Sequence, residues 1–214
     1  MKFPVNFIAL EQELAPMAPY LKGRVLNAGC GDRDITILLK SWHAGTVENC
    51  DIQTSIRGAF RCDLTSIPRP DGCYDAILCN AVLEHVPEPE KVMGEFHRLL
   101  ARDGHLVVSV PFLQPFHPTP FDFRRYTRAG LEQLGQRAGF RVVEMRPVHS
   151  LAQTIGWLLW AHLEERGSKL GKLFCWLPIY LASRLFQRPP TAQTYTANGF
   201  QAVMVKADEH KSIL

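Results

Sequence analysis

The most specific chemical signal in the sequence is a pair of glycines followed, further along the chain, by an aspartate. The short apolar run at residues 24–28 ends in Gly29-Cys30-Gly31, and glycines at i and i+2 allow a sharp turn and the close approach of a ligand. Asp51 lies twenty residues beyond Gly31, at the end of a second predicted strand. A carboxylate at that position suits the hydroxyls of a ribose, so the spacing predicts a nucleoside-binding turn.

The charge around this turn separates two candidate ligands. A dinucleotide-binding G-x-G-x-x-G pattern would require glycine at Asp34, and Asp32 adds a second negative charge beside it. Two carboxylates at the start of a helix suit the helix dipole but repel a pyrophosphate. The cationic nucleoside S-adenosylmethionine (SAM) is therefore the expected cofactor, and an NAD-dependent oxidoreductase is the weaker alternative.

Two further segments carry residues suited to proton transfer or substrate binding. Glu84-His85 follows a strong strand pattern; these residues either contact a substrate or accept a proton, or they brace the next helix. Residues 117–127 read HPTPFDFRRYT. In that segment we expect His117 to be the general base and Arg125 to bind an anionic group, with Asp122 beside them. The alternative is an Asp122–Arg125 pair that only fixes the loop.

Alternating strands and helices must position these residues. The patterns predict strands at residues 24–28, 46–50, 59–62, 74–79, 105–110, 141–145 and 200–206, and helices at 6–20, 32–42, 87–101 and 127–138. This order is typical of an α/β, Rossmann-like fold: a mostly parallel seven-stranded sheet with helices on both faces and a helical insert before the last strand. Ligands of such sheets lie beyond the carboxyl ends of the strands.

The sequence divides into four expected parts: an N-terminal helical segment (1–22), a SAM-binding core (23–148), an apolar and basic helical insert (149–188), and the last strand with the C-terminal tail (189–214). The insert has aromatic and aliphatic runs flanked by Lys and Arg. It is either a lid over the acceptor site, an oligomer interface, or an element that lies on a membrane surface.

The motifs at residues 25–111 resemble class I SAM-dependent methyltransferases, in particular the bacterial group called methyltransferase type 11. The resemblance rests on VLNAGCG, NCD, CDLTSIP, YDAILCNAVLEHV and an E-x-x-R-L-L-x-x-D-G-H run. It implies that Gly29 and Gly31 lie under the methionine part of SAM and that Asp51 binds the ribose hydroxyls. Ile52 and Asp63 would lie beside the adenine, and Asn80 and Ala81 would line the pocket after the fourth strand.

The sequence departs from the family pattern at three positions. Asn27 stands where the family usually has an acidic residue, and Arg33 where it often has a third glycine; Asn27 remains an expected cofactor contact but brings no charge. A related branch has an E-V-L-E-H segment associated with a divalent metal. Ala81 replaces the first Glu here, so no metal is expected. Glu84 and His85 instead orient a substrate, accept a proton, or brace the next helix.

Composition limits the partners and the compartment. The net charge of +3 over 214 residues is too small to favour nucleic acid. Residues 116–190 carry eleven Lys and Arg against five Asp and Glu, a local charge of +6, which leaves −3 elsewhere. Six cysteines without a C-x-x-C pair favour a reducing compartment. With no signal peptide and no run of about twenty apolar residues, we expect a cytoplasmic protein, either free or peripheral to the membrane.

The expected activity is transfer of the SAM methyl group to an oxygen or nitrogen atom. A basic rim and an apolar insert favour an anionic, lipid-linked or sugar-linked acceptor, and a small soluble acceptor is equally allowed. The alternative is a non-catalytic protein of the same fold that acts as a scaffold or membrane adaptor.

Overall fold

The computed structural model describes residues 3–118, 120–187 and 196–207. The last part of the predicted insert and most of the predicted tail, residues 188–195 and 208–214, therefore lie outside the described residues. Seven strands form one sheet: β1 (Gly23–Ala28), β2 (Ala44–Asp51), β3 (Phe60–Arg61), β4 (Tyr74–Asn80), β5 (Leu100–Pro111), β6 (Phe140–Val148) and β7 (Gly199–Lys206).

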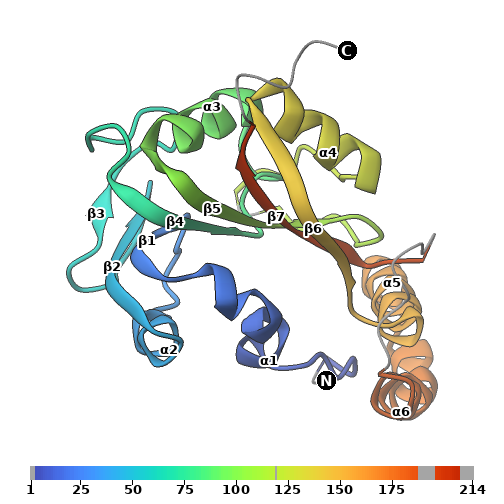
Figure 1. The fold of residues 1–214 in the computed structure, drawn as a ribbon. Helices are drawn as coiled ribbons and strands as arrows, with labels where there is room; N and C mark the ends of the chain where they lie inside the picture. The colour runs from blue at the N-terminus through green and yellow to red at the C-terminus, as the bar shows by residue number, and fades with distance from the viewer. Residues whose placement is uncertain (1–2, 119, 188–195, 208–214) are drawn as a thin grey trace.

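The strand order is β3-β2-β1-β4-β5-β7-β6. The first five strands pair in parallel, and β7 runs antiparallel to both β5 and β6. The prediction of a mostly parallel seven-stranded sheet is confirmed (Figure 1). Because the parallel strands share one direction, the loops that follow β1, β2, β4 and β5 meet at one edge of the sheet.

Helices cover both faces of the sheet, as predicted. On one face, side chains from α3 (Pro89–Leu99) and α4 (Arg128–Arg137) pack on Ile77 and Cys79 of β4. On the other face, α1 (Leu10–Leu14), the 3₁₀ helix η1 (Ala15–Tyr20) and α2 (Thr36–Ser41) pack on Ala76 and Leu78. Successive β4 side chains thus point to opposite faces, which explains why this strand is apolar at nearly every position.

Two predicted helix starts are wrong. The predicted helix 32–42 begins at Thr36, because Asp34 accepts a hydrogen bond from the Thr36 N–H and Asp32 instead binds the backbone and hydroxyl of Ser55. The predicted helix 6–20 begins at Leu10, and it continues as a 3₁₀ helix where the segment contains prolines.

The predicted helical insert is a hairpin of two helices, α5 (Leu151–Glu165) and α6 (Lys169–Leu185). Ser150 and Gln153 form a capping box at the start of α5, and Ser168 caps α6. The two helices pack on each other and on the N-terminal segment through a small core of Val5, Trp160 and Ile179. In Figure 1 the hairpin lies at the far end of β6 and β7, beside the N-terminal segment.

A buried carboxyl group meets a buried imidazole between α1 and the end of β6. Glu13 Oε2 lies 3.5 Å from His149 Nε2. Burial raises the pKa of Glu13 to about 7 and lowers the pKa of His149 to about 4. Because folding raises the pKa of Glu13, its contribution to the free energy of unfolding is complete below the ordinary pKa of 4.5. This contribution is lost as the pH rises through about 7.

We therefore expect Glu13→Gln to stabilise the protein at high pH. Glutamine mimics the uncharged acid, so the gain in unfolding free energy should be below about 1 kcal/mol at pH 5 and about 3 kcal/mol at pH 8. Urea unfolding at the two pH values measures it, with Glu11→Gln on the exposed side of the same helix as the control. An equal effect of Glu13→Gln at both pH values would contradict the assignment.

Candidate active site

The turn after β1 contains two glycines with different functions. Gly29 and Gly31 have φ values of +73° and +54°, which favour glycine at both positions. A Cβ atom on Gly29 would lie 2.4 Å from a methyl carbon of Val82, so this glycine lets the loop after β4 pack on the turn. A Cβ atom on Gly31 would meet no atom within 4 Å, so the space beside Gly31 is open to a ligand.

Asp51, the last residue of β2, is tied to this turn. Its Oδ2 accepts a hydrogen bond of 2.8 Å from the Gly31 N–H, and its Oδ1 accepts one of 2.9 Å from the Gln53 N–H. Each carboxylate oxygen has a second lone pair, so both can still accept hydrogen bonds from ribose hydroxyls. The carboxylate is therefore held beside the glycine turn, and its role toward a ribose stays a prediction.

The other predicted adenine-side residues lie at the ends of β2 and β3. Ile52 directly follows Asp51 and is 68% exposed, which leaves an apolar surface on which a flat ring can pack. Asp63 is exposed, and its Oδ1 accepts hydrogen bonds from the backbone and hydroxyl of Thr65. Its role toward the adenine amino group stays a prediction.

The residues after β4 have the features of a ligand-binding wall. Asn80 has a buried Oδ1 atom without a hydrogen-bond partner, and a buried acceptor of that kind is costly unless a ligand or water donates to it. Ala81 adopts a φ of +55°, which is unfavourable for a residue with a side chain, and its N–H donates to the Ser109 carbonyl. An open cradle at Gly31 and an orphaned acceptor at Asn80 both fit a polar nucleoside such as SAM.

Asn27 has a different environment from the one expected for a cofactor contact. It is buried, and its amide donates a 2.8 Å hydrogen bond to Asn49 Oδ1; Asn49 in turn donates to the Thr36 hydroxyl. This chain joins β1, β2 and α2. The geometry supports a role for Asn27 in fixing the turn more strongly than a direct contact with SAM.

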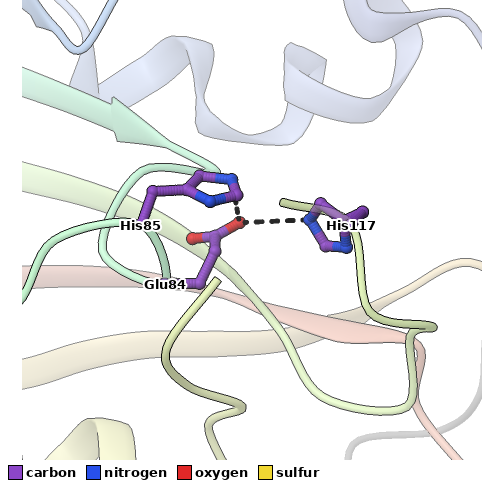
Figure 2. A group of neighbouring side chains, drawn as sticks. All are labelled: Glu84, His85 and His117. Carbon is purple, nitrogen blue, oxygen red and sulfur yellow. Dashed lines mark ion pairs between the residues drawn. The ribbon is translucent and has the colours of Figure 1, made fainter. Parts of the chain in front are cut away.

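Glu84, His85 and His117 form a second cluster, which lies beyond the ends of β4 and β5 (Figure 2). Glu84 Oε1 lies 3.7 Å from His85 Nε2 and 3.9 Å from His117 Nε2. Glu84 is 1% exposed, and the imidazoles are partly exposed. The structure thus brings Glu84 and His85 close to His117, although they lie in separate segments of the sequence.

Backbone carbonyl groups orient both imidazoles. His85 Nδ1 lies 2.5 Å from the Phe121 carbonyl oxygen, and His117 Nδ1 lies 2.9 Å from that of Pro115. His117 Nδ1 also lies 3.3 Å from Arg125 Nη2, a longer contact than the one with Pro115. A carbonyl oxygen only accepts, so we assign the hydrogen to each Nδ1, and each Nε2 faces Glu84. Glu84 is the main cause that raises the pKa of His117, so His117 is suited to holding a proton at Nε2.

Asp122 and Arg125 hold the loop that carries His117. Asp122 is buried and accepts a hydrogen bond from the His117 N–H. Arg125 donates to both carboxylate oxygens of Asp122 and to the carbonyls of Gln114, Pro115 and Arg124, which uses all five of its N–H groups. Arg125 therefore has no donor left for an anionic substrate, and the expectation that it binds one is replaced by a positioning role.

Several hydrogen bonds fasten the His117 loop to the Glu84 turn. The Phe123 N–H donates to the Glu84 carbonyl, Arg124 donates to the carbonyls of Val86 and Pro87, and the Tyr126 hydroxyl donates to that of Leu83. Buried Asp122 pairs with Arg125, which holds the pKa of Asp122 down at about 2. The cluster is thus held in place from both loops.

Aromatic side chains surround the cluster, and sequence reasoning missed this arrangement. Phe121 and Phe123 are exposed and pack together, with ring centroids 5.6 Å apart. Trp157 of α5 lies 6.0 Å from the His117 ring and 5.3 Å from Phe7. The alternation of prolines and aromatics around His117 was visible in the sequence, but the approach of Trp157 depends on how the hairpin packs.

Replacing Asp51 should weaken SAM binding. The change Asp51→Ala removes the acceptors beside Gly31, and we expect a loss of about 1–3 kcal/mol in binding free energy by calorimetry. The control is Asp34→Ala, which removes the same charge but only one hydrogen bond within the start of α2. Unchanged affinity in Asp51→Ala, or an equal loss in both variants, would refute the ribose assignment.

The comparisons with known proteins identify the family of the domain. The model of the methyltransferase domain family matches residues 7–145. A probable S-adenosylmethionine-dependent methyltransferase of Mycolicibacterium smegmatis is 27% identical over 133 residues, which are 55% of this chain and 52% of the relative. A demethylmenaquinone methyltransferase of Thermus thermophilus is 29% identical over 100 residues, which are 40% of this chain and 46% of the relative. The chain thus spans about half the length of these curated relatives.

The fold agrees as well. The crystal structure of a SAM-dependent methyltransferase from Archaeoglobus fulgidus superposes with a TM-score of 0.63 over 92% of this chain and 93% of that chain, at 15% identity. At this identity the likeness concerns the fold alone. The family model, however, covers well over half of the chain and includes the glycine turn, Asp51 and the Glu84 turn. The chain belongs to the methyltransferase domain family.

Proposed function

We propose that the protein is a SAM-dependent methyltransferase that acts on a lipid-linked acceptor at a membrane surface. The observation that carries this proposal is the position of Trp157. It belongs to the exposed apolar hairpin, and its ring lies 6.0 Å from that of His117. An acceptor held by the hairpin could therefore reach the polar cluster without crossing the rest of the protein.

The outer surface of the hairpin is apolar along both helices. Its exposed side chains recur at helical spacing and include Leu151, Ile155, Leu158 and Leu159 of α5 and Leu170, Leu173, Phe174, Leu177, Leu181 and Leu185 of α6. Large contiguous apolar patches are unusual on a monomer in water. Among the described residues, no helix has the length and apolar character needed to cross a bilayer, so the hairpin fits a surface position.

Basic residues support an anionic membrane as the partner. Lys169, Arg166 and Arg184 are exposed on or beside the two helices, and Lys172 pairs with Glu164. Exposed Lys and Arg beside an apolar helical face are typical of elements that bind anionic lipid surfaces. All N–H groups of Arg125 are bonded within the protein. The exposed Lys and Arg side chains of the hairpin are therefore better placed to contact an anionic acceptor group.

The acceptor class follows from the same surfaces. Phe121 and Phe123 add exposed rings beside the cluster, so an apolar chain can approach the imidazoles along aromatic side chains. One curated relative is named for demethylmenaquinone, and an acceptor of that kind would be compatible with this path. A sugar-linked acceptor on a lipid carrier fits equally well.

The reaction needs alignment and the removal of one proton. When bound, SAM supplies an activated methyl group whose carbon–sulfur bond breaks as the acceptor attacks, and the electron pair stays on sulfur. Asp51 and the glycine turn would hold the nucleoside, and alignment of this kind contributes about 7–11 kcal/mol. His117 Nε2 would take the proton of the acceptor oxygen or nitrogen, and Glu84 would stabilise the resulting imidazolium. His85 would contact the acceptor, and Asp122 and Arg125 would hold the loop.

Replacing His117 tests the catalytic part of the proposal. Labelled SAM is incubated with bacterial lipid extract, and methyl transfer into the organic phase is measured. We expect His117→Ala to lower the rate by about 10²–10⁴-fold while calorimetry shows unchanged SAM affinity. His162→Ala, an exposed imidazole on α5, is the control. No transfer by the wild-type protein to any lipid fraction, with SAM still bound, would favour a scaffold over an enzyme.

A charge on the hairpin tests the membrane part. We expect the double change Leu173→Glu and Phe174→Glu to abolish sedimentation with phosphatidylglycerol vesicles, because it places two carboxylates on the proposed membrane face. Methylation of a detergent-dispersed acceptor should persist. Ile37→Glu introduces a carboxylate at an even more exposed apolar position, on α2, and should leave vesicle binding intact. Wild-type protein that never sediments with such vesicles would overturn this part and favour a lid.

A further inference from the structure

The Glu84–His85–His117 cluster holds three ligand atoms of the kinds that bind transition metals. One carboxylate oxygen and two imidazole nitrogens lie within 4.8 Å of one another. Their separations of 3.7 and 3.9 Å are close to the roughly 3–4 Å between ligands that surround one ion at about 2.0–2.2 Å. Figure 2 shows the two imidazoles on either side of the carboxylate.

The tautomers favour a cation at the centre. Both Nδ1 atoms are hydrogen-bonded to carbonyl oxygens, so the neutral imidazoles present Nε2 lone pairs to an oxygen that also carries lone pairs. Such a group of acceptors needs a positive charge between them, which is either a proton on His117 Nε2 or a bound cation. Metal-binding histidines usually have this arrangement, in which the second ring nitrogen donates to a carbonyl and fixes the ring.

Glu84 supplies a second, independent observation. Its side chain is 1% exposed, and its Oε2 is buried without a hydrogen-bond partner. Among the described residues, its ion-pair partners are the two imidazoles alone. A buried carboxylate in this condition is strongly destabilising unless a charge or hydrogen bonds compensate it.

We propose that Glu84, His85 and His117 bind one divalent transition-metal ion, with Glu84 Oε1 and the two Nε2 atoms as its ligands. Two nitrogens and one oxygen suit Zn²⁺, Mn²⁺, Co²⁺ or Fe²⁺ and do not suit Mg²⁺, which prefers oxygen ligands. Three protein ligands leave a coordination position open, as in catalytic rather than structural sites.

The sequence led to the opposite expectation, and the reason is visible in the structure. Ala81 replaces the first acidic residue of the metal-associated segment of a related branch, so the sequence predicts no metal. His117 provides a third ligand from the loop after β5, thirty-two residues further along the chain. The hydrogen bonds between the two loops hold the three groups together before any ion binds.

The site would also deepen the proposed function, on which this role rests. An acceptor oxygen bound in the open position would lose its proton more easily, because a divalent ion stabilises the deprotonated form. In that form His117 acts as a ligand, and the proton leaves to solvent. Metal binding itself does not depend on the methyltransferase activity and can be measured without SAM.

The test uses the full chain after removal of metals with EDTA. CoCl₂ is titrated while visible absorption is recorded, and MnCl₂ is titrated by calorimetry. We expect one ion per chain, with Co²⁺ bands that lack the intense near-ultraviolet absorption of thiolate ligands. Affinity should fall by at least about tenfold in His117→Ala and in Glu84→Gln, and it should be unchanged in His162→Ala. MgCl₂ should not compete.

Three results would overturn the proposal: no binding of Co²⁺ or Mn²⁺, binding that His117→Ala leaves unchanged, or a Co²⁺ spectrum that shows thiolate ligation by the cysteines. Circular dichroism checks folding of each variant. His117 is partly exposed, so His117→Ala decides the matter if the buried Glu84→Gln variant does not fold. If methyl transfer continues at full rate in EDTA, the catalytic role of the metal is refuted while the proposed methyltransferase function stands.

Discussion

The parallel pairing of β1 with β2 and β4, and of β4 with β5, is the constraint on which both candidate sites depend. Hydrogen-bonded register sets Ala28 beside Cys50 and Asn80 beside Ser109. The chain therefore leaves four strands at the same edge of the sheet. The approach of the glycine turn to Asp51 and the meeting of the two loops of the Glu84–His85–His117 cluster both follow from that one arrangement, since these segments are far apart in sequence.

Polar groups at this edge are held in costly positions by a framework of backbone hydrogen bonds. Ala81 has a left-handed backbone, Asn80 and Glu84 each have a buried oxygen atom without a partner, and Asp122 is buried beside His117. Strain and unmet hydrogen bonds of this kind persist only where the surroundings enforce them, and they concentrate at functional sites. Here Arg125 and the carbonyl groups around it supply that enforcement.

The hairpin of α5 and α6 adds a second kind of constraint. Its inner face packs on the N-terminal segment, and its outer face leaves a row of leucines with Phe174 in solvent. Exposed apolar area of this size is unfavourable in water, which is the basis of the proposed membrane contact. Trp157 packs near both Phe7 and His117, so the hairpin lies close to the Glu84–His85–His117 cluster.

The sequence by itself determined the fold class, the succession of strands and helices along the chain, and the glycine turn with Asp51. These depend on local periodicity and on short, regular spacings. It also identified Glu84, His85, His117, Asp122 and Arg125 as polar residues near the carboxyl ends of strands. Only the tertiary structure decided what they do together. Arg125 is saturated by Asp122 and backbone carbonyl groups, Asn27 is bound to Asn49, and Glu84 faces two imidazoles. Such pairings form between loops far apart in the chain, so they depend on strand register and loop packing rather than on any pattern within one segment.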